Sequence, residues 1–137
     1  MNPILMDTNA YASLKRGHAE SISIVQRAPF IAMSSTVLGE LLGGFAVGAK
    51  EAQNRQELEV FLASPRVRLH VVDRDTAEKY AVIFASLRAS GTPIPTNDMW
   101  IAASAIQHGL SLFSFDAHFQ RVQGLRVGST VAELSTP

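Results

Sequence analysis

Short apolar runs, separated by longer stretches with helix signals, constrain the fold of this chain more than any other feature. The runs lie at residues 3–6, 30–33, 67–72, 110–115 and 125–127, and each has the length and composition of a strand. Strands joined through helices need crossover connections, which give parallel pairing with helices on both faces of the sheet. The pattern predicts an α/β fold with a central, mostly parallel sheet of about five strands.

The stretches between these runs predict the helices. We expect helices over residues 9–16, 20–27, 37–45 and 50–63, one capped by Asp73 or Asp75 that runs to about Ala89, one from Asp98 that stops at Gly109, and a short turn to Gln120. The helix that ends near residue 89 is expected to bury an apolar stripe of Tyr80, Ile83, Phe84 and Leu87. We also expect Gly43, Gly44 and Gly48 to interrupt the third helix, because glycine is a poor helix former.

The composition excludes several classes of protein. The chain has 12 basic and 12 acidic residues, so it is not a protein that binds nucleic acid over its whole surface, although a local basic groove stays open. It has no cysteine, which excludes a disulfide framework, a cysteine zinc site and a thiol nucleophile.

The length and the N-terminal segment limit the domain count and the location. A chain of 137 residues is the usual size of one domain, so we expect a single domain over residues 1–137. The N-terminal apolar run ends at Asp7 without a basic lead-in, which argues against a signal peptide. No apolar run approaches the roughly 18–20 residues of a membrane span. We therefore expect a cytoplasmic protein with no membrane partner.

Four acidic residues occupy positions where a parallel sheet usually binds its ligand, beyond the carboxyl ends of the strands. Asp7 directly follows the first strand and Asp116 the fourth, and Asp98 opens the helix that leads into the fourth strand. Glu40 is the only charged residue in the stretch 31–48, and an acid among apolar neighbours is costly unless it faces a crevice or a partner. We expect these four acids to meet at one end of the sheet.

A cluster of this kind predicts a metal site. Carboxylates in one crevice repel each other and raise each other's pKa. Magnesium or manganese relieves the repulsion, because both ions prefer carboxylate and water oxygens, and ions held in this way activate water for phosphodiester hydrolysis. The polar residues Thr8, Asn9 and Ser114 lie beside the acids and are expected to hold the carboxylates in fixed orientations, as are Thr96 and Asn97.

Each acid also fits an ordinary structural role. Asp7 and Asp98 can be helix N-caps, Asp116 a turn residue and Glu40 an exposed helix acid. These separate roles would place four acids at the same end of the sheet by coincidence, so a common site is the better interpretation.

The histidines and arginines are left outside the predicted site. His118 is near it because of Asp116 and is able to reach substrate, but we favour a structural role for it. Nine of the 12 basic residues are arginine, which suits bidentate phosphate contacts. The sequence does not say which face the arginines share, so their role stays open.

Four sequence blocks resemble those of PIN-domain nucleases, and more closely those of VapC-type toxin ribonucleases from type II toxin–antitoxin pairs. The blocks are Met6-Asp7-Thr8-Asn9, Ser-Thr-Val-Leu-Gly-Glu40-Leu-Leu-Gly, Asn97-Asp98-Met-Trp-Ile-Ala-Ala and Ser114-Phe-Asp116-Ala-His-Phe119. They occur in family order over almost the whole chain, and Gly124-Leu-Arg-Val resembles the family's ending.

The resemblance implies a fold, an activity and a set of partners. The fold is a PIN-like α/β/α sandwich, and the activity is that of an Mg²⁺- or Mn²⁺-dependent endoribonuclease that cuts RNA, often tRNA or rRNA. The resemblance also implies a homodimer and a VapB-like antitoxin that obstructs the site and supplies the operator DNA contacts.

The resemblance assigns roles to individual residues as well. Asp7, Glu40, Asp98 and Asp116 form the acidic cluster, with Asp7 and Asp98 as direct metal ligands. Asn9 and Ser114 take the supporting positions, and Ser114 stands where the family commonly has threonine, so the hydroxyl is kept.

Two other functions and two other folds are alternatives to this one. A non-catalytic PIN-like module that binds RNA or protein fits less well, since a decayed site would have lost one or more acids, and a DNA-directed nuclease is not separated by sequence. A receiver domain would need a late lysine, whereas the last one here is Lys79. A haloacid-dehalogenase phosphatase would need D-x-D after the first strand, where this chain has Asp7-Thr-Asn.

Overall fold

A five-stranded parallel sheet forms the centre of the molecule. The computed structural model describes residues 1–135. The strand order is β3-β2-β1-β4-β5, and all four neighbouring pairs are parallel. The strands are β1 (Ile4–Met6), β2 (Ile31–Ser34), β3 (Val67–His70), β4 (Ser111–Phe113) and β5 (Val127–Gly128). The predicted α/β fold with about five parallel strands is confirmed.

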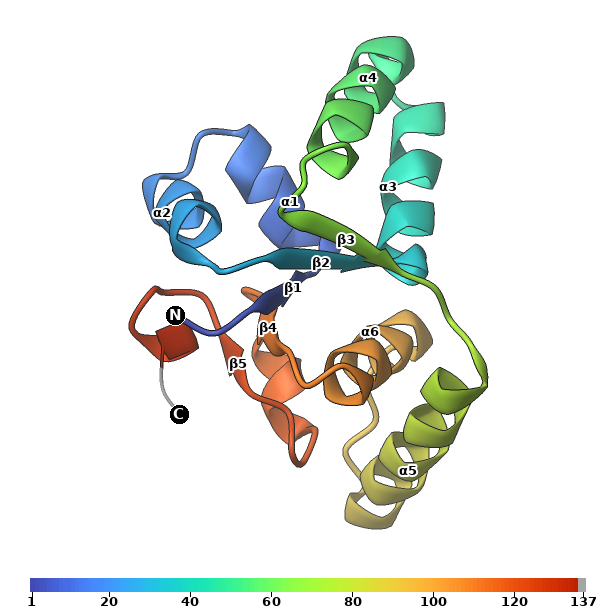
Figure 1. Cartoon of the computed structure of the whole chain (residues 1–137). Helices are drawn as coiled ribbons and strands as arrows, with labels where there is room; N and C mark the ends of the chain where they lie inside the picture. The colour runs from blue at the N-terminus through green and yellow to red at the C-terminus, as the bar shows by residue number, and fades with distance from the viewer. Residues whose placement is uncertain (136–137) are drawn as a thin grey trace.

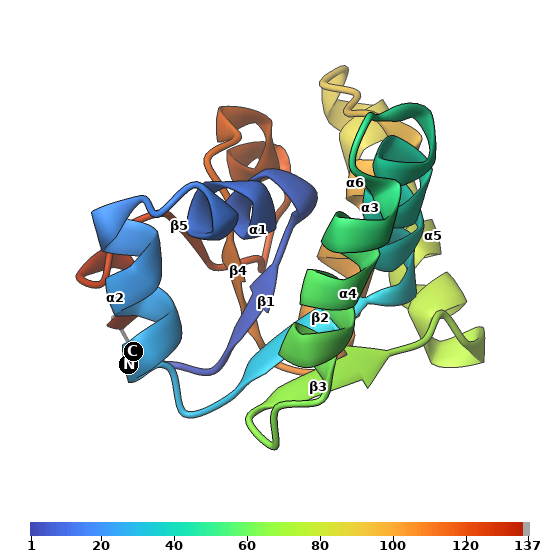
Figure 2. The ribbon, with the colours of Figure 1, turned by 90° about the horizontal axis from the view of Figure 1, so that it is seen from above.

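Helices cover both faces of this sheet (Figure 1). One face carries α1 (Thr8–Lys15), α2 (Ala19–Arg27), α3 (Ser35–Val47) and α4 (Glu51–Leu62), and Figure 2 shows α1 beside α2 and α3 beside α4. The other face carries α5 (Arg74–Ser90), α6 (Thr96–Gln107) and the short 3₁₀ helix η1 (Ala117–Arg121), and η2 (Glu133–Ser135) packs beside β5. The connections β1→β2→β3 and β3→β4→β5 run in opposite directions across the sheet, so right-handed crossovers place their helices on opposite faces.

The central strands β1, β2 and β4 are buried on both faces. All three residues of β1 are 0% exposed, and the central pair β1 and β4 has no exposed side chain. Strands of this kind are continuous apolar runs without alternation. Each large apolar side chain buried in this way contributes about 1.5–3 kcal/mol relative to an exposed one.

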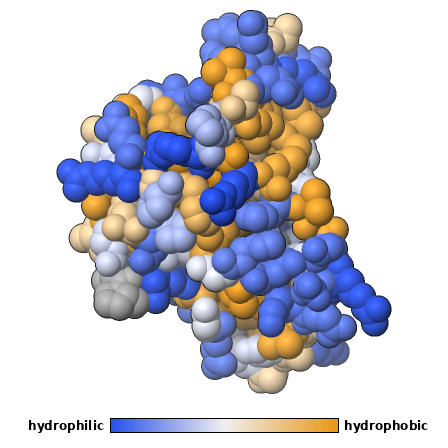
Figure 3. Space-filling view, viewed as in Figure 1, coloured by the Kyte–Doolittle hydropathy of each residue, from blue (hydrophilic) through white to orange (hydrophobic). Residues whose placement is uncertain are grey.

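Three predicted strands are too long or shifted. β3 ends at His70, because its one neighbour β2 ends opposite it at Ser34 and the chain then turns toward α5, leaving Val71 and Val72 61% and 41% exposed. β4 covers only residues 111–113, and β5 covers 127–128 rather than 125–127. In the view of Figure 3, hydrophobic side chains gather on the surface near the end of β3 and over α3.

Two helix predictions also need correction. α3 continues through Gly43 and Gly44 and ends only before Gly48; core contacts of its apolar residues offset a helix cost of about 1 kcal/mol per glycine. On α5, Ile83 and Leu87 are buried as predicted, whereas Phe84 is 44% exposed. No helix within residues 1–135 is both long and apolar enough to cross a membrane.

An acidic cavity as the candidate active site

The sheet topology creates a crevice between β1 and β4. The chain leaves β1 toward β2 on one side of the sheet and leaves β4 toward β5 on the other. Loops that diverge from neighbouring parallel strands in this way leave room for a ligand at the carboxyl ends. The two strand ends are tied together, since the backbone N–H of Asp7 donates to the Phe113 carbonyl at 3.2 Å.

A cavity of about 580 Å³ opens at this end of the sheet. Its walls come from the start of α1, from α3, from the loop before α6 together with the first turns of α6, and from the loop after β4. The structure brings all four acids singled out in the sequence to this cavity. The lining residues are Asp7, Thr8, Asn9, Glu40, Pro95, Thr96, Asn97, Asp98, Ile101 and Asp116.

Asp7 is the most buried of the four acids, at 5% exposed. It caps α1, because its Oδ1 accepts a hydrogen bond from the backbone N–H of Ala10 at 2.8 Å. Burial raises the pKa of the Asp7 carboxyl above its ordinary value of 3.8. Hydrogen bonds from Ser114 and Ala10 oppose this rise, whereas the charges of Asp98 and Asp116 add to it. Asp7 is therefore both a helix cap and a wall of the cavity.

Glu40 reaches the cavity from α3 and is held by two side chains. The Thr8 hydroxyl donates to its Oε1 at 2.6 Å, and the Asn97 amide donates to its Oε2 at 3.3 Å. Thr8 belongs to α1 and Asn97 to α6, so this carboxylate links three helices. Glu40 is partly buried, so an exposed helix acid is the wrong interpretation of it.

Asp98 and Asp116 are joined by His118. The Nε2 atom of His118 lies 2.6 Å from Oδ2 of Asp98, and its Nδ1 lies 3.3 Å from Oδ1 of Asp116. Asp98 is the third residue of α6, whose N-cap position is held by Pro95. The N-cap interpretation of Asp98 is therefore wrong, and its carboxylate is free to line the cavity.

His118, for which the sequence favoured a structural role, contacts two acids of this site. Its ring is partly buried between two acids of the cavity and rests 4.9 Å from the ring of Phe119, which is fully buried and anchors η1. The sequence signal was the D-x-H spacing of Asp116 and His118 in one short helical turn. His118 is the residue of this site that sequence reasoning undervalued.

The predicted supporting residues differ in what they contact. Ser114 is 3% exposed, its Oγ accepts from the backbone N–H of Asp116 at 3.0 Å, and its hydroxyl also hydrogen-bonds Asp7. Ser114 thus connects the acid after β1 with the acid after β4. Asn9 lines the cavity with an exposed side chain.

The electrostatics of the cavity are strained. Burial raises the pKa of Asp98 above 3.8, and the charges of Glu40 and Asp116 add to the rise, while the hydrogen bond and charge of His118 oppose it. Asp98, Asp116 and His118 each offer a ligand atom, and these atoms lie within 4.8 Å of one another. A partly buried set of carboxylate oxygens that repel each other fits a hard divalent cation.

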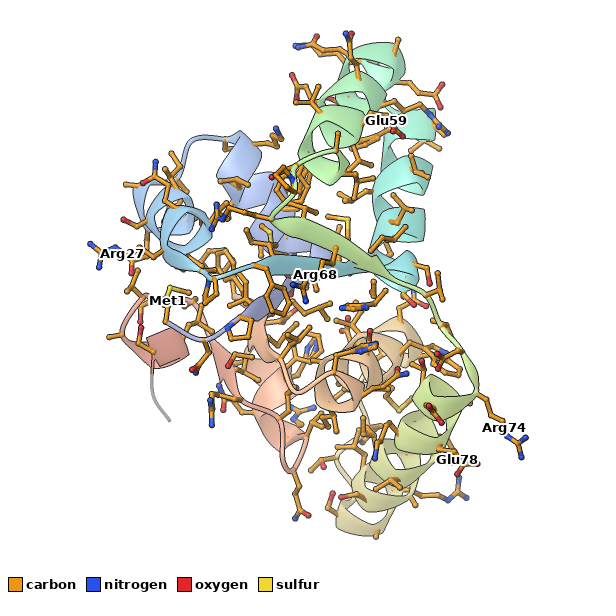
Figure 4. All side chains as sticks on the ribbon, in the orientation of Figure 1. Met1, Arg27, Glu59, Arg68, Arg74 and Glu78 are labelled. Atoms are coloured by element: carbon orange, nitrogen blue, oxygen red, sulfur yellow. The ribbon has the colours of Figure 1, made fainter. Side chains whose placement is uncertain are left out.

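The arginines do not line this cavity. Among the described residues that form its walls there is neither lysine nor arginine. Arg66 donates to backbone carbonyls at the end of α2, and the guanidinium of Arg68 lies 3.7 Å from the ring centroid of Phe30. Figure 4 shows Arg27 and Arg74 pointing outward from opposite ends of the molecule. The arginines, whose shared face the sequence left open, therefore form no part of the cavity walls.

Known proteins share this sequence pattern. A family model described as "PIN domain" matches residues 4–125. Ribonuclease VapC4 of Mycobacterium tuberculosis is 31% identical over 96 residues, which are 69% of this chain and 73% of the relative. Ribonuclease VapC2 of Rickettsia felis is 29% identical over 128 residues, which are 88% of this chain and 92% of the relative.

A solved structure shares the fold. It is the crystal structure of VapBC2 from Rickettsia felis bound to a DNA fragment from their promoter. The match has a TM-score of 0.81 at 24% identity and covers 92% of this chain and 97% of that chain. At this identity, the likeness supports the fold alone.

Proposed function

Because the chain belongs to the PIN-domain family and, within it, to the VapC ribonucleases, we propose that it is the metal-dependent endoribonuclease toxin of a toxin–antitoxin pair. One observation carries the metal dependence. Four carboxylates from separate segments line one cavity, and two of them have a pKa raised by burial and by their neighbours. Such unfavourable electrostatics cluster at functional sites, where a ligand relieves them.

In this proposal the ion binds among the acids of the cavity. Asp7 and Asp98 would hold Mg²⁺ or Mn²⁺ directly, with Asp116 and Glu40 completing the set directly or through water. A divalent ion in this position supplies positive charge that lowers the pKa of a water and offsets the negative charge of the phosphodiester.

The surrounding side chains keep the carboxylates in place. Thr8 and Asn97 fix both oxygens of Glu40, and Ser114 couples Asp7 to the backbone of Asp116. His118 sets the separation of Asp98 and Asp116 by contacting both. Preorganised carboxylates need little rearrangement when the substrate binds, which favours the transition state. Water is the nucleophile in this mechanism, and no side chain forms a covalent intermediate.

The partners follow from the same family. The solved relative named above is a VapBC complex on promoter DNA. We propose that this chain, acting as one nuclease domain, binds a VapB-like antitoxin that obstructs the acidic cavity, forms a homodimer, and meets operator DNA only through the antitoxin. Its substrate in this proposal is RNA, with tRNA and rRNA as the first classes to test.

An assay with matched substrates tests the proposal. Purified protein is incubated with tRNA, with rRNA and with single-stranded DNA, each in Mg²⁺, in Mn²⁺ and in EDTA. We expect RNA cleavage that requires either ion. Cleavage in EDTA overturns the metal mechanism, and preferential cleavage of DNA makes the chain a DNA-directed nuclease. RNA binding without cleavage in any ion makes it a non-catalytic module.

A further inference from the structure

An aromatic side chain lies exposed in the loop that carries Asp116. Phe115 stands between Ser114 and Asp116, and it is 46% exposed. Scattered exposed apolar residues are normal on a protein surface and need no partner. The position of Phe115 is different, because its immediate neighbours in the chain are one residue that holds Asp7 and one acid that lines the cavity.

Two other rings hold Phe115. Its ring lies 5.6 Å from that of Phe113 and 5.7 Å from that of His18, at interplanar angles of 63° and 84°. Phe113 is fully buried, and Nδ1 of His18 accepts from the backbone N–H of Ser21 at 3.3 Å and lies 2.9 Å from its Oγ. Both supports are therefore fixed to the fold. An aromatic side chain held in this way loses little conformational entropy when it binds a partner.

The described residues that line the cavity offer no aromatic ring on which an RNA base could stack. In the part of the chain that the structure describes, the cavity is lined by acids, small polar side chains, one proline and one isoleucine, without an aromatic ring. Phe115 is one residue from Asp116, a backbone step of about 3.8 Å. Phe115 therefore shares a short loop with Asp116, and an RNA segment that crosses this loop to reach the carboxylates passes an exposed ring.

We propose that Phe115, held by His18 and Phe113, is a stacking platform for a base that flanks the phosphodiester cut in the acidic cavity. The proposal rests on the ribonuclease function above and adds a substrate-binding residue to it. Unpaired bases of RNA stack on phenylalanine and histidine rings, and stacking tolerates any base because every base has a π-face. The substrate segment at the cut is accordingly single-stranded, and selectivity at this position reflects stacking strength.

Phe84 is the matched control for Phe115. It is 44% exposed, close to the exposure of Phe115, and it lies on α5 beside Tyr80 rather than in the loop that carries Asp116. Truncating it removes the same side chain from the surface at a similar exposure. If Phe115→Ala weakens RNA binding and Phe84→Ala leaves it unchanged, the loss is specific to the position of Phe115. A general loss of apolar surface would affect both variants.

Binding is measured first, in an Asp98→Asn background that prevents cleavage. The probe is a fluorescein-labelled single-stranded oligoadenylate of about ten nucleotides, followed by fluorescence anisotropy. We expect Phe115→Ala and Phe115→Leu to raise Kd roughly tenfold, Phe115→Tyr to restore it, and Phe84→Ala to leave it within about twofold. Equal affinities of Phe115→Ala and its parent, or no binding by the parent, overturn the assignment. So does full rescue by leucine, which supplies apolar bulk without a stacking face.

Kinetics on the RNA that the otherwise wild-type protein cleaves supply the second test. We expect Phe115→Ala to raise KM about tenfold and to change kcat little, because the ring contacts a flanking base and not the reacting atoms. A fall in kcat at constant KM overturns the platform. If Phe115→Ala leaves KM unchanged but weakens binding of the antitoxin, the ring belongs to a protein interface and the proposal is wrong. Absence of cleavage by the unmodified protein is a failure of the ribonuclease proposal, and it is recognised without reference to any Phe115 variant.

Discussion

Asp7 and Asp73 have the same local role and opposite electrostatics. Each lies between a strand and the helix that follows it, and each caps that helix. The Asp7 carboxylate accepts a hydrogen bond from the backbone N–H of Ala10, and the Asp73 carboxylate accepts one from the backbone N–H of Thr76. Burial raises the pKa of Asp7. The backbone hydrogen bond from Thr76 lowers the pKa of Asp73, and side-chain hydrogen bonds from Gln107 and Thr76 lower it further.

The difference separates a carboxylate with a structural role from one that we propose binds the metal. Asp73 is exposed and has donors on every side: a reciprocal capping box with Thr76, and the Gln107 amide at 2.9 Å. Asp7 accepts fewer hydrogen bonds, is buried, and interacts with the charges of other carboxylates. A helix cap and a functional site are therefore not alternatives at one residue. The direction of the pKa shift distinguishes Asp7 from Asp73, whereas the cap geometry does not.

The largest expected effect is on RNA cleavage, and it tests this comparison directly. Asp7→Asn and Asp98→Asn each remove a proposed metal ligand and should lower kcat/KM at least about a hundredfold. Asp73→Asn makes the same chemical change at the satisfied cap and should leave cleavage within about twofold, as should Asp75→Asn. The measurement is initial rate against Mg²⁺ concentration. Equal losses at Asp7 and Asp73 would mean that the cavity is not the active site.

His118 gives the next largest effect. His118→Asn removes the ring that contacts both Asp98 and Asp116, so the carboxylates lose a shared orienting partner. Changes to such orienting groups typically cost 10- to 100-fold in metal affinity or activity. We expect cleavage to fall by about tenfold or the half-saturating Mg²⁺ concentration to rise by that factor. The control is His108→Asn, just beyond the far end of α6. If both variants behave alike, His118 has no special part in the site.

Most of the fold could be predicted from the sequence, because apolar runs and breakers act locally. Apolar runs predicted the strands around Leu5 and Leu112, and Gly109 predicted the end of the preceding helix. The end of β3 was not, since Val71 and Val72 have the composition of a strand and only the end of β2 at Ser34 leaves them outside the sheet. Phe84 was misplaced for a similar reason, because spacing along a helix does not say how far the neighbouring helix covers it.

The site shows the same limit. The ends of parallel strands share one edge, so the convergence of Asp7 and Asp116 could be expected from the topology alone. The partners of each carboxylate depend on side chains of distant helices, such as the contact of Asn97 with Glu40 and that of His118 with Asp98. No spacing in the sequence encodes those pairs.

Stability without metal gives the third prediction. Asp7→Asn keeps an acceptor for the α1 cap and removes a charge that burial disfavours, so it should raise the melting temperature in EDTA by about 3 °C, the shift that about 1 kcal/mol gives in a domain of this size. Asp73→Asn removes a charge that its hydrogen bonds favour, so it should lower the melting temperature slightly. Excess Mg²⁺ should reverse the order of Asp7→Asn and wild type, because only the intact site gains binding energy. A lower melting temperature for Asp7→Asn in EDTA would contradict the strained cluster.

The smallest effect is the pH dependence of these differences in melting temperature. It checks whether the pKa of each aspartate is raised or lowered on folding. The pKa of Asp7 is raised on folding, so its carboxyl stabilises the fold fully below its ordinary value of 3.8, and this contribution is lost as pH rises through the folded pKa. The advantage of Asp7→Asn in EDTA should therefore be absent near pH 3.5 and grow toward neutral pH. The pKa of Asp73 is lowered, so its contribution is present above 3.8 and is lost as pH falls through the folded pKa. The two variants should thus diverge from wild type in opposite directions as pH rises from about 3.5 to about 7, measured as melting temperatures at constant ionic strength. Parallel curves would mean that Asp7, like Asp73, is only a helix cap.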